Sequence, residues 1–216
     1  LYDENIFIKK RLFMTATERV FRGDSDETIS MDDEVIYGRI VDEFSFKSAL
    51  EQKPKILSDY QISTTATFKN EIKELIENNE LLKAGNKQWT FEADASTFAA
   101  LITLRKAIQE LKVKHVISFH RSISRAREFQ QLNDAVNNFG TKFGYIHSYH
   151  INGKKGTGKR SEIINRFISE EPSLITNARC LTEGVDIPEV DAVLFADPKD
   201  STVDIVQAAG RAMRVS

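Results

Sequence analysis

The stretch "SLITNARCLTEGVDIPEVDAVLFADPKDSTVDIVQAAGRAMR" occupies residues 173–214 and contains the clearest structural pattern in the chain. It holds two short apolar runs, at 173–178 and 191–197, which predict two β-strands. The second run is followed by the spacing of an amphipathic helix, and Ser201 or Thr202 is placed to cap its first turn. Short apolar strands joined to amphipathic helices are typical of a parallel sheet that is buried on both faces.

The same alternation occurs earlier in the chain. "KHVISF" (114–119) and "FGYIHSYHI" (143–151) predict two more strands, and each precedes an amphipathic helix, at 122–136 and 158–169. Ser122 or Ser124 is placed to cap the first of these helices, and Ile163, Ile164, Phe167 and Ile168 are expected to face inward from the second. The predicted fold class is therefore α/β, with a parallel sheet and helices on both of its faces.

A further helix is predicted upstream, because apolar residues recur there at helical spacing: Leu101, Leu104, Ile108 and Leu111. Near the N-terminus, "NIFIKKRLFMTAT" (5–17) is rich in β-branched and aromatic residues and predicts a strand that runs into a turn. In parallel sheets of this kind, ligands collect beyond the carboxyl ends of the strands.

Composition excludes several classes of protein. The formal net charge of the 216 residues is −2, so contact with nucleic acid requires a local basic patch rather than a basic chain. The single cysteine, Cys180, permits no intrachain disulfide and favours a cytoplasmic location. No apolar run has the length of a membrane span and no signal peptide is evident, so we expect no membrane partner. Because the sequence starts at Leu1 rather than Met, we expect it to be a piece of a longer protein.

The segment "HINGKKGTGKRSEII" (150–164) is similar to a phosphate-binding loop. Gly153, Gly158 and Lys159 match the pattern G-x-x-x-x-G-K-[ST], but Arg160 stands where a hydroxyl must hold Mg²⁺. Three interpretations of these residues are open. They form a nucleotide loop centred on Lys159, a solvated basic turn that starts a helix, or a turn that meets a nucleic-acid backbone.

The C-terminal stretch resembles the last two signature motifs of superfamily 2 helicases and translocases. The first motif is a threonine, Thr176 or Thr182, followed by E-G-x-D-x-P up to Pro188. The second is Q-x-x-G-R-x-x-R at 207–214. Two earlier segments match as well, since "VISFHRSISRAREF" (116–129) resembles the start of the second motor lobe and "RLFMTAT" (11–17) resembles the S/T-A-T motif that ends the first.

This resemblance implies a RecA-like parallel sheet and a division into three parts. Residues 1–23 would be the tail of the first lobe, and 24–52 a connector similar to that of restriction-type translocases. Residues 53–216 would be the second RecA-like lobe, with a helical insertion at about 69–111. In this family the basic segment at 147–167 carries a loop that faces nucleic acid, which favours the third interpretation of that segment.

The function implied is that of the C-terminal lobe of an ATP-dependent DNA helicase or translocase. The full-length parent would use ATP and Mg²⁺, and its partners would be DNA, with RNA less favoured, and its own first lobe. Neither a phosphate-binding loop nor a magnesium motif of the first lobe occurs in the sequence. We therefore expect the chain alone to bind neither ATP nor Mg²⁺ and to hydrolyse no ATP.

Residues for the nucleotide follow from the resemblance. Arg211 and Arg214 would be the catalytic, phosphate-sensing arginines, with Arg214 as the arginine finger, while Gly184, Asp186 and Gln207 would contact ATP. Positions 207, 211 and 214 have the spacing i, i+4 and i+7, so they share one face of a helix.

Residues for nucleic acid follow in the same way. Six are predicted to contact the phosphate backbone: Ser118, His120, Arg121, Gly153, Lys154 and Thr176. Thr15 and Thr17 would couple nucleotide state to lobe movement. The histidines have no metal-ligand spacing with Cys180, and we predict no metal site in the chain. The alternatives are a nucleic-acid-binding module without motor activity and a stand-alone NTPase that uses Lys159.

Overall fold

A computed structural model of the chain describes residues 7–15, 18, 20–23, 29–64, 70, 91–138, 144–153, 156–178, 187, 189–199 and 201–213. The chain divides into two compact units, an N-terminal unit of residues 1–49 and a C-terminal unit of residues 50–216. The predicted limits at residues 23 and 52 stay predictions.

The centre of the C-terminal unit is a parallel sheet. Its strands are β1 (His115–Phe119), β2 (His147–Ile151), β3 (Ser173–Asn177) and β4 (Ala192–Phe195), in the order β2-β3-β1-β4. Each neighbouring pair is parallel, as the sequence predicted. All four strands therefore end at the same edge of the sheet, which is the edge where ligands collect in such folds.

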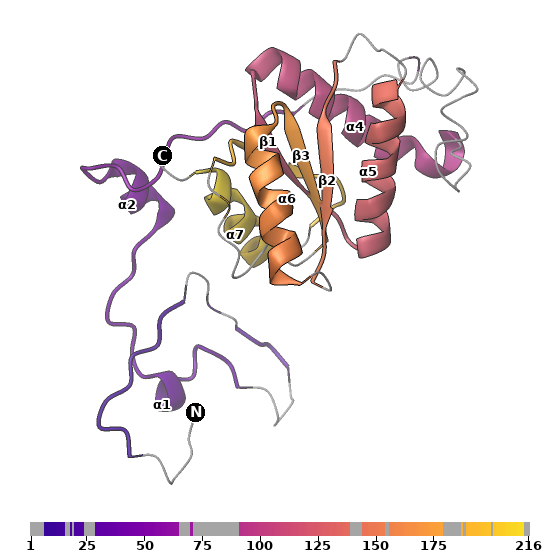
Figure 1. Cartoon of the computed structure of the whole chain (residues 1–216). Helices are drawn as coiled ribbons and strands as arrows, with labels where there is room; N and C mark the ends of the chain where they lie inside the picture. The colour runs from indigo at the N-terminus through magenta and orange to yellow at the C-terminus, as the bar shows by residue number, and fades with distance from the viewer. Residues whose placement is uncertain are drawn as a thin grey trace. The chain divides into compact units, whose positions relative to one another are not determined.

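Helices cover both faces of this sheet (Figure 1). Helices α4 (Phe91–Leu111) and α5 (Ile123–Asn138) share one apolar core with the sheet, and α6 (Thr157–Ser169) and α7 (Thr202–Ala212) share the other. The predicted α/β fold with a doubly covered RecA-like parallel sheet is confirmed.

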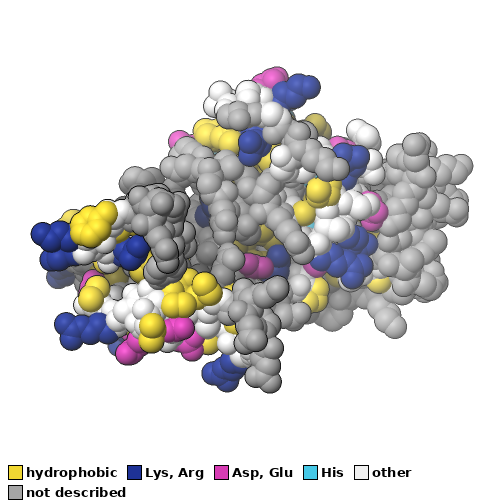
Figure 2. Space-filling model, turned by 90° about the horizontal axis from the view of Figure 1, so that it is seen from below, with side chains coloured by type: hydrophobic (Ala, Val, Ile, Leu, Met, Phe, Trp, Pro, Cys, Tyr) yellow, Lys and Arg dark blue, Asp and Glu magenta, His cyan; other side chains and the backbone are white. Residues whose placement is uncertain are grey.

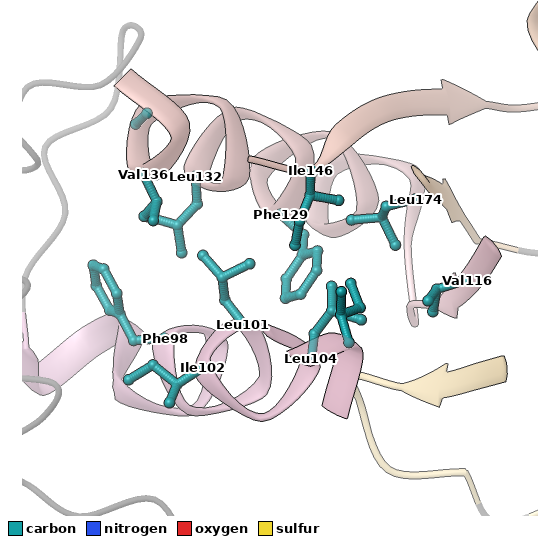
Figure 3. Packing of buried hydrophobic residues seen from close by; sticks show 12 residues of the cluster. Phe98, Leu101, Ile102, Leu104, Val116, Phe129, Leu132, Val136, Ile146 and Leu174 are labelled. Carbon is teal, nitrogen blue, oxygen red and sulfur yellow. The ribbon is translucent and has the colours of Figure 1, made fainter. Parts of the chain in front are cut away.

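Alternation along β1 and β3 separates the two cores. Val116 and Leu174 face the core under α4 and α5, whereas Ile117 and Ile175 face the core under α6 and α7. Successive residues of a strand point to opposite faces, so every residue of these two strands is buried. Figure 3 shows the first core, where Leu101 and Leu104 of α4 point toward Phe129 of α5.

Helix α4 belongs to this core. Its predicted apolar stripe is buried at Leu101, Leu104 and Ile108, while Leu111 at the end of the helix is exposed. The described part of the segment at 69–111 therefore contributes a helix to this core, and its status as an insertion stays a prediction. Burying one leucine or phenylalanine stabilises a fold by roughly 1.5–3 kcal/mol. The buried side chains of α4 therefore contribute substantially to the stability of the C-terminal unit.

Serine side chains cap the N-termini of two helices. The backbone N–H of Arg125 donates to Ser122 Oγ at 3.2 Å, and that of Asp204 donates to Ser201 Oγ at 3.2 Å. The sequence predicted two alternative N-cap residues for each helix. In the structure the N-cap is Ser122 for α5 and Ser201 for α7. On α6, Phe167 is buried and Ile163, Ile164 and Ile168 pack around it, as predicted.

A buried arginine joins α4 to α5 and to the segment before β2. The guanidinium of Arg105 donates to Gly144 O at 2.7 Å, to Asn133 Oδ1 at 2.6 Å and to Asn137 Oδ1 at 2.8 Å. Both asparagine amides in turn donate to Ile146 O. Burial lowers the pKa of Arg105 to about 10, so the side chain keeps its charge at neutral pH.

We expect Arg105→Ala to lower the free energy of unfolding by about 3 kcal/mol, because buried acceptors lose their donors. The exposed Arg127 on α5 provides a matched control, and Arg127→Ala should change the same quantity by less than about 0.5 kcal/mol. Urea unfolding followed by circular dichroism measures both variants. Equal effects of the two substitutions would contradict the structural role of Arg105.

The N-terminal unit contains two short helices, α1 (Glu34–Tyr37) and α2 (Phe46–Glu51), of which α2 extends past its boundary. The strand predicted at 5–17 is wrong for the described residues 7–15, which form no strand. Within this unit, Phe13 contacts Tyr37 edge to face, with ring centroids 4.9 Å apart. Phe7 and Met14 are 93% and 87% exposed, so this segment lacks the neighbour that a strand needs.

Candidate functional site

The carboxyl edge of the sheet is formed by the turns that follow the strands. Backbone hydrogen bonds join these turns beyond the strands, since His120 N–H donates to Asn177 O at 2.9 Å and Ala196 N–H donates to Phe119 O at 3.2 Å. The turn from β1 to α5 is thereby held beside both β3 and the turn from β4 to α7. Loops at such an edge are well placed for binding because a rigid sheet positions them.

A buried set of polar side chains lies just below this edge. We call it the polar seam, and it consists of Ser118, His120, His150, Asn152 and Thr176. Ser118 Oγ lies 2.9 Å from His120 Nε2, His150 Nδ1 lies 3.1 Å from Thr176 Oγ1, and His150 Nε2 lies 3.3 Å from Asn152 Nδ2. Hydrogen bonds among its members offset the cost of burying these polar groups.

Burial keeps His120 neutral. It lowers the pKa of His120 to about 4, with the nearby carboxylate of Asp197 opposing the shift and Arg125 and His150 adding to it. At neutral pH, His120 is therefore a hydrogen-bonding group of the interior and not a cation available to a phosphate.

The six residues predicted to contact nucleic acid fall into different environments. Ser118 and Thr176 are 0% exposed and His120 is 2% exposed, so their described contacts are internal, and contact with a phosphate stays a prediction for them. Arg121 and Gly153 are exposed at the carboxyl edge. Lys154 lies outside the described residues.

The basic segment at 147–167 contains strand β2 and most of helix α6. Gly156 is the N-cap of α6 and makes no side-chain cap hydrogen bond, Lys159 is exposed on the first turn, and Arg160 donates its backbone N–H to Gly156 O. The strand–turn–helix arrangement predicted for this segment is present. A role of this segment toward a nucleotide or a nucleic acid stays a prediction.

Helix α7 carries two of the predicted nucleotide residues. Its buried side packs on the core through Ala208 and Ala212, and Gln207 and Arg211 flank that side and are partly exposed. The two polar side chains are one helical turn apart and share a face. Arg214, Gly184 and Asp186 lie outside the described residues, so their places in the site stay predictions. Of the two coupling residues, Thr15 is exposed in the N-terminal unit and Thr17 is not described.

Asp197 was not among the predicted site residues, but the structure places it as a buried carboxylate at the carboxyl edge. Its Oδ2 accepts a hydrogen bond from Arg121 N–H at 3.0 Å, and its Oδ1 lies 3.9 Å from the guanidinium of Arg125. An acidic residue directly after an apolar strand was the available signal, because that position falls at the ligand-bearing edge of a parallel sheet.

Figure 2 shows charged side chains of both signs on the face it draws. On the face drawn in Figure 2, the described Lys and Arg side chains lie in several small groups rather than in one continuous patch.

Within the described ranges, no three His, Cys, Asp or Glu side chains gather closely enough to hold a metal ion. None of the helices in those ranges is long and apolar enough to span a membrane.

Protonation of His120 predicts a pH dependence. The ordinary pKa of 6.5 falls to about 4 in the folded state, so the unfolded chain binds more protons between these values. Stability should therefore decrease as the pH falls through this range, by about 2 kcal/mol between pH 7 and pH 5 for this one group. Urea unfolding at both pH values measures the free energy of unfolding. His120→Gln should remove the part of its pH dependence that His120 causes. An unchanged pH dependence in the variant would refute the assignment.

The chain is similar to known helicases. Residues 99–216 match the model of the helicase conserved C-terminal domain, which covers more than half of the chain. "Probable helicase A859L" of African swine fever virus (isolate Pig/Kenya/KEN-50/1950) is 28% identical over 206 residues, which is 93% of this chain and 20% of that protein. "Putative DEAD-box ATP-dependent RNA helicase 51" of Oryza sativa subsp. japonica is 30% identical over 111 residues, 51% of this chain and 17% of that protein.

A solved structure extends the likeness. "ATP-dependent Type ISP restriction-modification enzyme LlaBIII bound to DNA" matches 87% of this chain and 13% of that chain, with 26% identity and a TM-score of 0.67. The chain spans about a fifth of the length of the curated relatives that match nearly all of it. With its parallel sheet and doubly covered faces, the chain belongs to the helicase conserved C-terminal domain family and has the RecA-like fold of the second lobe of superfamily 2 proteins.

Proposed function

We propose that this lobe serves an ATP-dependent DNA translocase, in which α7 supplies cationic groups to ATP and the carboxyl edge contacts DNA. The observation that carries the proposal is the partly exposed pair Gln207 and Arg211, placed one turn apart on a helix whose other side is anchored in the core. Such a helix can present its side chains to a nucleotide without losing its own packing.

The proposed chemistry is stabilisation of charge. Phosphoryl transfer places negative charge on the transferred oxygens, and an arginine directed at them lowers the barrier. Arg211 would contribute a guanidinium and Gln207 an amide, while Arg214 would be the finger by resemblance to the family. ATP would supply the reactive triphosphate.

The remaining groups would come from the first lobe. By resemblance to the family, Mg²⁺ would be held by a magnesium motif of the first lobe through carboxylate oxygens. The N-terminal unit supports such a partner, because it exposes apolar side chains that a folded neighbour would cover, among them Phe7, Met14 and Val35.

DNA is proposed as the nucleic acid. The restriction-modification enzyme that matches most of this chain is described as bound to DNA. In the present chain, Arg121 is exposed at the carboxyl edge on the turn before α5, where the helix N-terminus also favours a phosphate.

Hydrolysis provides the first test. The chain alone should hydrolyse no ATP, and the full-length parent should do so in the presence of DNA. Arg211→Ala or Arg214→Ala in the parent should lower kcat by roughly 10³-fold, as for other arginines that meet a transferred phosphate. Coupled ATPase assays measure these rates, with Arg127→Ala as the control that leaves them unchanged. Hydrolysis by the chain alone that survives Arg214→Ala would overturn the proposal.

Salt dependence provides the second test. If Arg121 neutralises one phosphate, Arg121→Ala should weaken binding of the chain to a DNA oligonucleotide and reduce the slope of log K against log salt by about 1. Fluorescence anisotropy at several salt concentrations measures both quantities. Arg127→Ala removes another exposed arginine, which lies on α5, and should leave the slope unchanged. Identical slopes for wild type and Arg121→Ala would rule out this contact.

A nucleic-acid-binding module without motor activity is the second candidate, favoured by the exposed Lys159 on the uncapped first turn of α6. It requires tight DNA binding by the chain alone that is not increased by the first lobe. A stand-alone NTPase would instead require nucleotide binding that Lys159→Ala abolishes.

A further inference from the structure

One carboxylate connects the two parts of the proposed site. Asp197 lies in the turn from β4 to α7, four residues before Ser201, the N-cap of that helix. Its side chain reaches the turn from β1 to α5, where Oδ2 accepts the hydrogen bond from Arg121 N–H at 3.0 Å. The same oxygen lies 3.9 Å from His120 Nδ1.

The negative charge of Asp197 lies close to a positive charge on α5. His120 is neutral at pH 7, since its pKa is about 4. Arg125 on the first turn of α5 supplies a positive charge, with its guanidinium 3.9 Å from Asp197 Oδ1. Arg125 also donates to Thr97 Oγ1 of α4 at 2.9 Å and lies 3.7 Å from Glu128, so its position is held from three sides.

A nucleic-acid phosphate at Arg121 would compete with this carboxylate. Both are anions, and both are attracted by the same positive groups, which are Arg125 and the N–H groups at the start of α5. Two anions in a partly buried space repel each other strongly because solvent screens them less there. Binding of a phosphate therefore weakens the hold of Asp197 on the Arg121 turn.

We propose that Asp197 is a positioning residue that transmits nucleic-acid binding at the Arg121 turn to helix α7. The inference rests on the proposed function, since it requires nucleic acid at the carboxyl edge. Release of Asp197 frees the turn that leads into α7 and alters the start of the helix that carries Gln207 and Arg211. The link is physical and short, because a single side chain joins the two turns.

The test uses the 216-residue chain, an unlabelled duplex DNA oligonucleotide and backbone amide NMR. In the wild type, DNA should shift the amide resonances of residues 201–213 as well as those near Arg121. Asp197→Asn retains an oxygen that can accept from Arg121 N–H but removes the charge, so the protein should stay folded and bind DNA while the shifts at 201–213 are lost. Asp197→Ala, which removes the acceptor too, should lose them as well.

Glu128→Gln is the matched control. Glu128 is another carboxylate near Arg125, and it lies on α5 rather than in the turn from β4 to α7. This variant should retain the shifts at 201–213.

The outcomes separate the inference from the function beneath it. Absence of DNA binding by the wild type would overturn the proposed function together with the inference. Binding without shifts at 201–213, or shifts that Asp197→Asn retains, would overturn the inference alone. Loss of the shifts in both Asp197→Asn and Glu128→Gln would also overturn it, because the effect would then belong to Arg125.

Discussion

Burial of β1 and β3 on both faces is the constraint on which the rest of the structure depends. Each residue of these two strands is buried, and alternate residues contact different helical layers. A strand in this position cannot slip by one residue, because the shift would exchange its two faces. The register of the sheet is thereby specified, and with it the edge at which the four strands end.

Toward that edge the interior changes from apolar to polar. The polar seam continues the face of Val116 and Leu174, and its serine, threonine and histidines satisfy one another by hydrogen bonds. A buried polar network is stable only when its members have partners, so the seam holds the edge in one arrangement. The exposed groups that follow it, such as Arg121, are consequently presented from a rigid base.

The candidate site combines groups from distant parts of the chain. The turn after β1, the turn before α7 and α7 itself contribute, and Asp197 is the side chain that joins the two turns. On α7, Gln207 and Arg211 are partly exposed, and within the described residues no three His, Cys, Asp or Glu side chains gather closely enough to hold a metal ion. This arrangement is compatible with the proposed motor, in which the nucleotide would lie between this lobe and a first lobe.

Periodicity along the chain was enough to predict β1 to β4, the helices that cover them, and the parallel arrangement, because alternation and helical spacing are local properties. The two signature motifs, the first ending at Pro188 and the second at 207–214, were likewise enough to predict the family. Strand order, the core position of α4 and the Arg105 contacts were not predictable, since they depend on which segments meet in space. For the same reason the strand expected at 5–17 fails over its described residues, because strand propensity needs a neighbouring strand. The burial of His120 and the link through Asp197 also arise only where separate turns converge at one edge.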